Sequence, residues 1–396
     1  MARKRVLYGV LIFFMITLIS AAIYINSLIP IITGYAAKNL CSAVFISGRQ
    51  QADVEAVDLY FSFIKFTKND VDLIEKSVTS HFLWGKSKAI FREGFGSTLL
   101  RDIPEGTLRK MKYPVNIKPD YSQDTIDWPL GDVLPDNLTG INVSQLAVIS
   151  KKLVIDNLYN GNAFAFLVLH KGIPVVEAYK PEFNQNTRFI SWSMAKSFTN
   201  ALVGLLLKEG KLDIQQQAGF DEWENDDRRK ITLNNLLQMQ SGLKWNEDYG
   251  TKSDVTLMLH CESDMSHFAI NQASEHPAGS YWYYSSGTAN IVSYLVRKQF
   301  NIDTSYYAFA HKQLFNTTGM PDAVFEVDPS GTFVGSSYLY ATARDYARFG
   351  LLYENDGIFN GQRILPEGWV DYSISEATAS NGEYEEWILT GCLRIS

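Results

Sequence analysis

The sequence predicts a mixed α/β (α+β) fold: an antiparallel strand pair and a helical region, preceded by one transmembrane helix. Three observations carry this prediction. Residues 6–32 form an uncharged, apolar run. Residues 163–169 and 175–179 read as two strands around the short turn His170-Lys171-Gly172, which is typical of a hairpin. After residue 193, apolar residues recur at helical spacing until Glu209-Gly210.

Composition sets broad limits on function. The chain has 396 residues, of which 46% are hydrophobic and 20% charged, as in ordinary globular proteins. Its length suggests one large or two moderate domains. A net charge of −7 argues against nucleic acid as a partner. The six histidines show no H-x-x-x-H or H-x-H spacing, so no metal site is expected.

The N-terminus is typical of a membrane anchor. Arg3-Lys4-Arg5 precede the apolar run, which as a helix spans roughly 30 Å of hydrocarbon. Basic residues on this side place the N-terminus in the cytoplasm and the rest of a single-pass protein in the periplasm or outside the cell. A cleaved signal peptide ending near Ser20-Ala21-Ala22 is the alternative. The apolar run continues beyond that point through Ile31, which favours a retained signal anchor.

The rest of the chain divides in two. Residues 33–142 form an N-terminal accessory region without a chemical motif, and within it residues 69–80 suggest a short helix. Residues 114–135 are rich in Pro and Asp and indicate a linker. We therefore place the boundaries at residues 1–32 (basic tip and transmembrane anchor), 33–142, and 143–396, which holds the candidate chemistry.

Ser193 and Lys196 are the leading catalytic candidates. They lie three residues apart at the start of a helix, so they share one face of its first turn. The helix N-terminus favours a developing alkoxide on the serine, and a lysine held neutral could take its proton. Two other S-x-x-K sequences, at Ser62 and Ser241, do not open a helix. The alternative for Ser193 is an ordinary helix cap beside a solvated lysine.

A second candidate lies in an aromatic turn. Tyr281-Trp282-Tyr283-Tyr284 precedes the helical pattern that contains Ile291 and Leu295. A phenol at such a turn can project into a cleft, where a neighbouring ammonium would lower its pKa and let it relay a proton. Simple aromatic packing explains the same residues.

Several ordered motifs together resemble one family. Ser193-Met194-Ala195-Lys196, Ser241-Gly242-Leu243, Tyr284-Ser285-Ser286 and residues 342–352 are similar to motifs of the serine β-lactamase and penicillin-binding-protein superfamily. The branch resembled is the class C-like one, which includes esterases and 6-aminohexanoate-oligomer hydrolases, and the resemblance covers roughly residues 144–372. It implies a β-lactamase-like antiparallel sheet flanked by helices, with a helical subdomain.

The resemblance also implies roles for individual residues. Ser193 would be the acylated nucleophile, Lys196 its activating partner, and Tyr284 would share proton transfer with Lys196. Ser286 stands where many relatives have asparagine and would contact the substrate. The backbone N–H of Ser193 would supply half of an oxyanion hole. The implied reaction is two-step acyl transfer from a small-molecule or peptide ester or amide, a β-lactam or cell-wall peptide among them, to water, without a cofactor.

One part of the family pattern is not found. No K-T-G or H-x-G motif follows Tyr284, and too few residues remain for the terminal strands that carry it. We therefore expect an incomplete C-terminus with the terminal strands missing, and a chain that folds poorly or partially. Losing one oxyanion donor typically costs ~10²–10³ in rate. The alternative function is a catalytically inactive β-lactamase-fold protein that acts as a cell-envelope binding or interaction module.

Overall fold

The computed structural model describes residues 2–379 except 116, 136–139 and 159–160. The expectation of missing terminal strands concerns the stretch after residue 379, which lies outside the described residues. The helices are α1 (Ala2–Phe45), α2 (Gln51–Val57), α3 (Glu105–Leu108), α4 (Val143–Val154), α5 (Ala195–Lys208), α6 (Leu233–Leu237), α7 (Asp254–Cys261), α8 (Met265–Ile270), α9 (Ser286–Arg297), α10 (Asp303–Phe309), α11 (Ala343–Glu354) and α12 (Trp369–Ile374).

The strands are short and antiparallel where they pair. They are β1 (Lys68–Asp72), β2 (Ser77–Phe82), β3 (Gly85–Arg92), β4 (Gly96–Leu99), β5 (Ala165–His170), β6 (Ile173–Tyr179), β7 (Phe189–Ile190), β8 (Val324–Phe325), β9 (Leu339–Ala341), β10 (Ile358–Phe359) and β11 (Gln362–Arg363). Their sheets have the orders β1-β2-β3-β4, β5-β6, β7-β9-β8 and β10-β11. The expected mixture of helices with antiparallel strands is confirmed.

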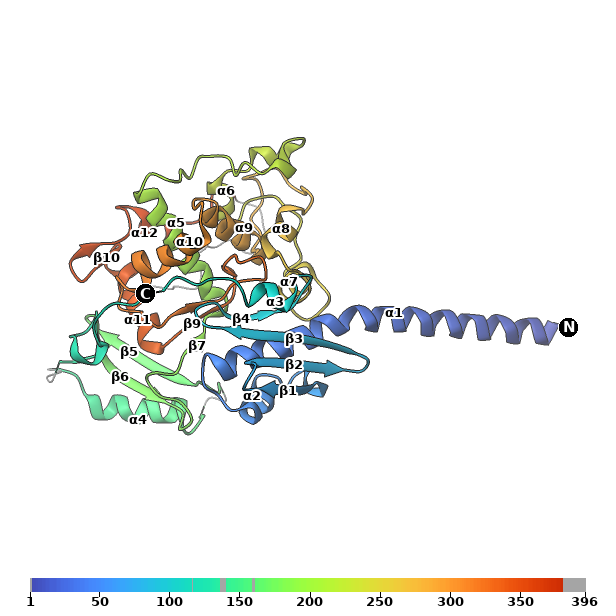
Figure 1. Cartoon of the computed structure of the whole chain (residues 1–396), viewed down its shortest axis with the longest axis horizontal. Coiled ribbons are helices and arrows are strands. Elements are labelled where there is room, and N and C mark those ends of the chain that lie inside the picture. The colour runs from blue at the N-terminus through green and yellow to red at the C-terminus, as the bar shows by residue number, and fades with distance from the viewer. Residues whose placement is uncertain (1, 116, 136–139, 159–160, 380–396) are drawn as a thin grey trace.

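Helix α1 has two halves with different surroundings. Its first half projects from the body of the molecule as an isolated rod (Figure 1). The helix does not end at residue 32, where we placed a boundary, but continues to Phe45. It continues because Ala36, Ala37, Leu40 and Cys41 are fully buried in a hydrophobic cluster with the adjoining sheet. Within the described residues, this is the one helix long and apolar enough to cross a membrane.

The sheet β1–β4 packs along the second half of α1 (Figure 1). The helix we expected at residues 69–80 is wrong, because this stretch forms β1, a turn and β2. The apolar Leu73 and Ile74 are exposed in the turn. The Asp72 side chain accepts hydrogen bonds from the backbone N–H of Ile74 and Glu75, and this local bonding competes with a helix.

A buried ion pair joins α1 to the rest of the protein. Lys38 Nζ lies 2.5 Å from Glu326 Oε2, and both side chains are almost completely buried. The other carboxylate oxygen, Glu326 Oε1, accepts hydrogen bonds from Ser42 Oγ at 2.9 Å and from the Ser97 backbone N–H at 2.6 Å. Burying charges is unfavourable unless they are paired, so this set of partners fixes α1, β4 and β8 relative to one another.

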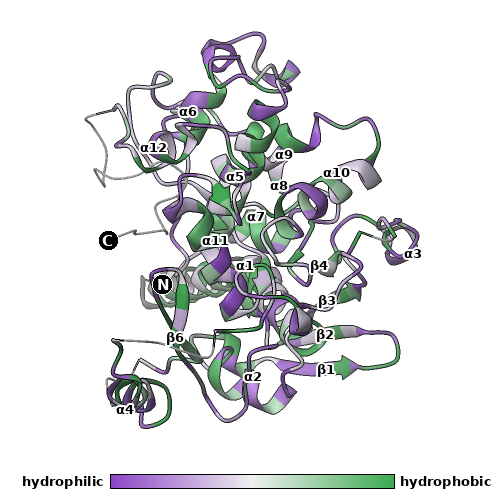
Figure 2. Cartoon of the chain, turned by 90° about the vertical axis from the view of Figure 1, so that its left-hand side faces the viewer, coloured by the Kyte–Doolittle hydropathy of each residue, from purple (hydrophilic) through white to green (hydrophobic). Residues whose placement is uncertain are grey.

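The predicted hairpin is confirmed. Strands β5 and β6 are joined by Lys171 and Gly172, both of which have positive φ (51° and 78°), as a tight two-residue turn requires. Within the described residues the two strands pair only with each other. Helix α4 packs on β6. Hydrophobic residues gather along α5 and α9 in the middle of the molecule (Figure 2), and residues 195–206 of α5 are all buried.

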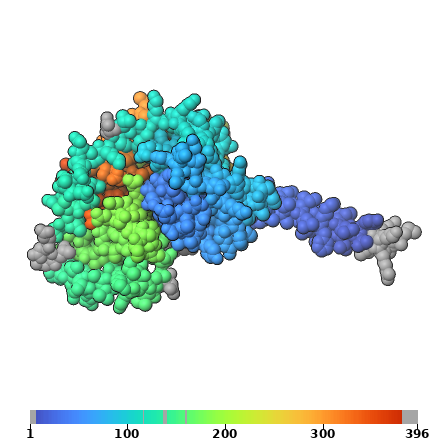
Figure 3. All heavy atoms as spheres, turned by 60° about the horizontal axis from the view of Figure 1, so that its bottom comes forward, coloured from blue at the N-terminus to red at the C-terminus, as the bar shows by residue number. Residues whose placement is uncertain are grey.

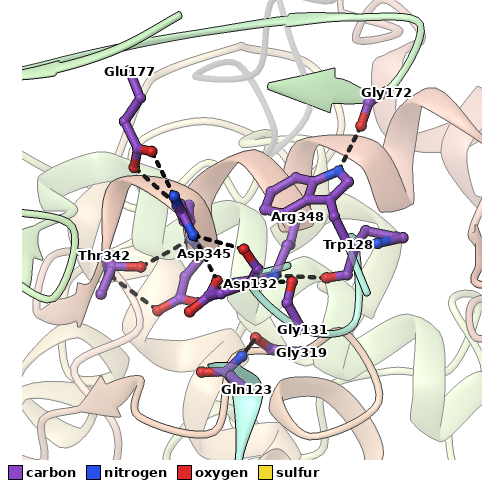
Figure 4. A network of polar contacts seen from close by, with 12 residues as sticks. Gln123, Trp128, Gly131, Asp132, Gly172, Glu177, Gly319, Thr342, Asp345 and Arg348 are labelled. Atoms are coloured by element: carbon purple, nitrogen blue, oxygen red, sulfur yellow. Dashed lines mark hydrogen bonds and ion pairs between the residues drawn. The ribbon is translucent and has the colours of Figure 1, made fainter. Parts of the chain in front are cut away.

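Arginines on α11 hold the predicted linker against the domain. Arg348 lies between Asp132 and Asp345, with Nη–Oδ1 distances of 2.5 and 3.0 Å (Figure 4). Arg344 donates to both oxygens of Glu177 on β6, at 2.7 and 2.9 Å. Charge-assisted bonds of this kind are roughly twice as strong as neutral ones. The segment around Asp132 is therefore part of the packed domain.

The ion pair of α1 leads to a stability prediction. Glu326→Gln should destabilise the protein by about 3–5 kcal/mol, because it leaves the Lys38 ammonium buried without a counter-charge. Urea unfolding of the detergent-solubilised chain, followed by tryptophan fluorescence, measures this change. The double variant Lys38→Met/Glu326→Gln should recover much of the loss.

Asp322→Asn provides the matched control, because Asp322 pairs with Lys118 at the surface. Exposed pairs contribute about 0–1 kcal/mol. A Glu326→Gln variant that loses no more stability than Asp322→Asn would show that the buried pair does not hold α1 in place.

Candidate active site

Ser193 lies where an extended segment becomes the central helix. Strand β7 pairs with β9, and the next residue, Ser191, accepts from the Leu339 N–H at 3.2 Å through its Oγ. A short 3₁₀ turn, Trp192–Met194, then leads into α5. Ser193 is partly exposed, so it is accessible to a ligand. The prediction that it opens a helix is confirmed.

Trp192, the residue before Ser193, has a strained backbone. Its φ is 45°, a conformation rarely adopted by bulky side chains and costing of order 1–3 kcal/mol. The indole stacks on Tyr35 of α1, with ring centroids 6.4 Å apart, and lies beside Tyr338 at 6.1 Å. These neighbours hold the turn in the conformation that presents Ser193.

Lys196 is the buried cation of the site, with 1% of its surface exposed. Its Nζ lies 3.3 Å from Ser193 Oγ, 3.2 Å from Ser286 Oγ and 3.0 Å from the carbonyl oxygen of Ser336. Three oxygen acceptors match the three N–H groups of an ammonium. The structure thus brings together three of the predicted elements: Ser193, Lys196 and the start of α9.

Glu247 completes this arrangement and was not predicted. Its carboxylate accepts hydrogen bonds from both the N–H (2.9 Å) and the Oγ of Ser286. It also accepts from Trp245 Nε1 and, at 2.9 Å, from the hydroxyl of Tyr249. Four donors saturate the acceptor sites of a carboxylate. Glu247 lies in an irregular loop without a recognisable motif, so the sequence offers no signal for its role.

Tyr249 is held as a hydrogen-bond donor. Although half of this residue is exposed, its hydroxyl lies between Glu247 and Ser286 Oγ, 3.3 Å from the latter. Burial of the hydroxyl and then the Glu247 charge raise the pKa of Tyr249 well above its usual value. It therefore remains protonated across the physiological range.

Tyr284 and Ser286 take positions that the sequence did not specify. The Lys196 ammonium lies over the ring of Tyr284, 4.6 Å from its centroid, which is a cation–π contact. Among the hydrogen bonds of the described residues, none joins Lys196 to the Tyr284 hydroxyl. Ser286, expected to contact the substrate, is fully buried between Lys196 and Glu247.

The arrangement has the geometry that a serine nucleophile, an amine base and an orienting carboxylate would require. The hydroxyl of Ser193 faces the amine of Lys196, and Ser286 connects that amine to Glu247. A cavity of about 260 Å³ lies beside Trp245 and is lined further by Met239, Tyr281, Tyr283 and Ser285. Within the described part of the chain, no group of three or more His, Cys, Asp or Glu is arranged to hold a metal ion.

Comparison with known proteins agrees with the resemblance found in the motifs. A family model described as Beta-lactamase matches residues 158–391, more than half of the chain. The 6-aminohexanoate-dimer hydrolase of Paenarthrobacter ureafaciens is 25% identical over 225 residues, which cover 52% of this chain and 56% of that protein. The chain thus spans little more than half the length of this relative.

One of the solved structures compared has a TM-score above 0.5 and shares the fold. A protein provisionally described as a 6-aminohexanoate-dimer hydrolase from Bacillus anthracis matches with a TM-score of 0.51 and 24% identity, over 59% of this chain and 66% of that one. A class C β-lactamase matches with a TM-score of 0.45 and 16% identity, over 61% and 72%. The resemblance found in the motifs is confirmed, and the chain belongs to the β-lactamase family, in the superfamily of serine β-lactamases and penicillin-binding proteins.

Proposed function

We propose that the protein is a membrane-anchored serine hydrolase that cleaves an ester or amide through an acyl-enzyme on Ser193. The observation that carries this proposal is the contact between Lys196 Nζ and Ser193 Oγ, 3.3 Å apart at the start of α5. A serine activated by an adjacent amine at a helix N-terminus is a recurring acyl-transfer arrangement. The family's hydrolases supply the reaction class.

Acylation would proceed through a tetrahedral intermediate. Ser193 Oγ forms a bond to the substrate carbonyl carbon while its proton passes to Lys196, which must first give up one proton of the ammonium described above. The carbonyl oxygen becomes an oxyanion, which the Ser193 N–H stabilises. Collapse of this intermediate breaks the bond to the leaving group, which takes the proton from Lys196. Water then repeats the sequence on the acyl carbon and regenerates Ser193.

Glu247 would stabilise the charge that forms on Lys196. In the transition state Lys196 becomes an ammonium, and Ser286 Oγ lies between this ammonium and the Glu247 carboxylate. A fixed negative charge near a forming ammonium stabilises that ammonium. Its part would resemble that of the carboxylate in a Ser-His-Asp triad, which orients and stabilises the base without taking its proton.

The proposed substrate class comes from a relative, and the proposed location comes from α1. One relative is named a 6-aminohexanoate-dimer hydrolase, which supports a small linear amide; a β-lactam, a cell-wall peptide and a simple ester use the same chemistry. The exposed first half of α1 supports a single-pass anchor, with the catalytic domain in the periplasm or outside the cell.

Covalent labelling tests the acyl-enzyme. After incubation of the detergent-purified full chain with a fluorophosphonate and, separately, a penicillin, intact mass spectrometry should show a single adduct. The Ser193→Ala variant should show none, because it lacks the nucleophile. An unmodified wild-type chain that still unfolds cooperatively would contradict the proposal and favour the non-catalytic binding module.

Glu247→Gln should reduce the rate of Ser193 acylation by about 10²-fold, the lower end of what positioned acid–base groups contribute. Removal of the negative charge should also shift the rate profile to lower pH, because the ammonium that forms on Lys196 during the reaction loses its counter-charge. Stopped-flow labelling across pH 5–10 measures both changes. The exposed Glu224→Gln is the control. A slower rate with an unshifted pH profile would indicate a purely structural role for Glu247.

A further inference from the structure

The first half of α1 meets an exposed hairpin tip where it joins the body. Side chains of α1 from Leu7 to Ile25 are exposed. Beside the end of this exposed stretch, the turn between β2 and β3 presents Leu83 and Trp84, which are 62% and 66% exposed. The Trp84 indole N–H donates to Asn26 Oδ1 at 2.9 Å. The tip therefore has a defined place beside the helix.

A second apolar segment lies at the same end of the sheet. Phe63 and Phe66 are 55% and 60% exposed, and the Phe63 ring lies 6.4 Å from that of Phe82, next to the hairpin tip. We call Phe63, Phe66, Leu83 and Trp84 the collar. Figure 3 shows atoms of this N-terminal region around the place where the rod leaves the body.

The length of the rod places the collar at a particular depth. Residues 6–25 carry no charge and, at 1.5 Å per residue, extend about 30 Å, which is the thickness of the hydrocarbon core. Arg3-Lys4-Arg5 mark one end of this segment, and Asn26, bonded to Trp84, marks the other. If Arg3-Lys4-Arg5 lie at one membrane interface, residues 6–25 cross the hydrocarbon core and Trp84 lies at the opposite interface.

Exposed cations accompany the collar. Lys65 Nζ lies 5.2 Å from the centroid of the Phe66 ring. The strand register pairs Lys68 with His81 and His81 with Lys86, so these lysines lie at the collar end of the sheet. The nearby carboxylate of Asp70 lies 3.3 Å from His81. Lysines beside aromatic residues suit a surface of phosphate headgroups.

We propose that the collar inserts into the outer headgroup region of the bilayer that α1 spans. The catalytic domain would then contact the membrane surface directly, in addition to its connection through α1. Tryptophan is enriched at this interface because its indole is apolar on its faces and donates a hydrogen bond at its edge. Large exposed apolar patches mark interaction sites, and here the patch continues the exposed surface of the spanning helix. This inference rests on the proposed membrane anchoring.

Depth-dependent quenching tests the inference on the full chain. The protein is reconstituted in nanodiscs of 3:1 phosphatidylcholine and phosphatidylglycerol, with the phosphatidylcholine brominated either near the headgroup (6,7-dibromo) or deep in the core (11,12-dibromo). The shallow bromines should quench part of the tryptophan fluorescence more than the deep ones do. Trp84→Phe should abolish most of this difference, whereas Trp192→Phe, which removes an exposed indole near Ser193, should keep it.

Two results would overturn the inference, and they are distinguishable. If the chain enters the nanodiscs and Trp84→Phe is quenched as strongly as the wild type, Trp84 lies away from the lipid and only the collar proposal fails. If the chain does not remain with the nanodiscs in size-exclusion chromatography, the proposed anchor fails as well.

Discussion

Burial of the Lys196 amine is the constraint on which the site depends. A cation out of contact with water must be surrounded by acceptors, and here these come from three separate segments: Ser193, Ser286 and the carbonyl of Ser336. Helix α5, the start of α9 and the loop before β9 therefore have to converge on one atom. The same convergence brings Ser193, Lys196 and Glu247 together, so the packing that buries Lys196 also assembles the candidate site.

The N-terminal helix is linked to this convergence. Lys38 of α1 lies 4.0 Å from the centroid of the Tyr338 ring, two residues after the carbonyl that accepts from Lys196. Tyr35, one turn earlier, stacks on Trp192 beside the nucleophile. The buried pair of Lys38 with Glu326 keeps these contacts in place. The helix that we propose as the anchor thus also contacts two segments next to the candidate site, at Trp192 and Tyr338.

Sequence reasoning succeeded where a local pattern decides the structure. The hairpin at Lys171-Gly172 and the helix that begins after Ser193 follow from turn chemistry and apolar spacing. It failed at residues 69–80, where tertiary packing of alternate residues against α1 overrides an apparent helical pattern. The end of α1 was also missed, because its second half is stabilised by contacts with residues far along the chain.

The candidate site shows the same division. Ser193, Lys196 and Tyr284 could be selected from motifs, and the structure places them together. Glu247 could not, because its importance comes from four donors that meet it only in the fold. Ser286 could also be selected from its motif. We expected it to contact the substrate, but in the structure it is buried between Lys196 and Glu247.

The pH dependence of Ser193 acylation in the wild type and in Lys196→Arg tests the central claim most directly. A guanidinium keeps the positive charge but cannot lose its proton. If Lys196 is the base, the wild-type rate should rise with pH, and Lys196→Arg should be slower by about 10²-fold or more at every pH. Similar rates and similar profiles for the two proteins would contradict the account and show that Ser193 is not activated by its lysine.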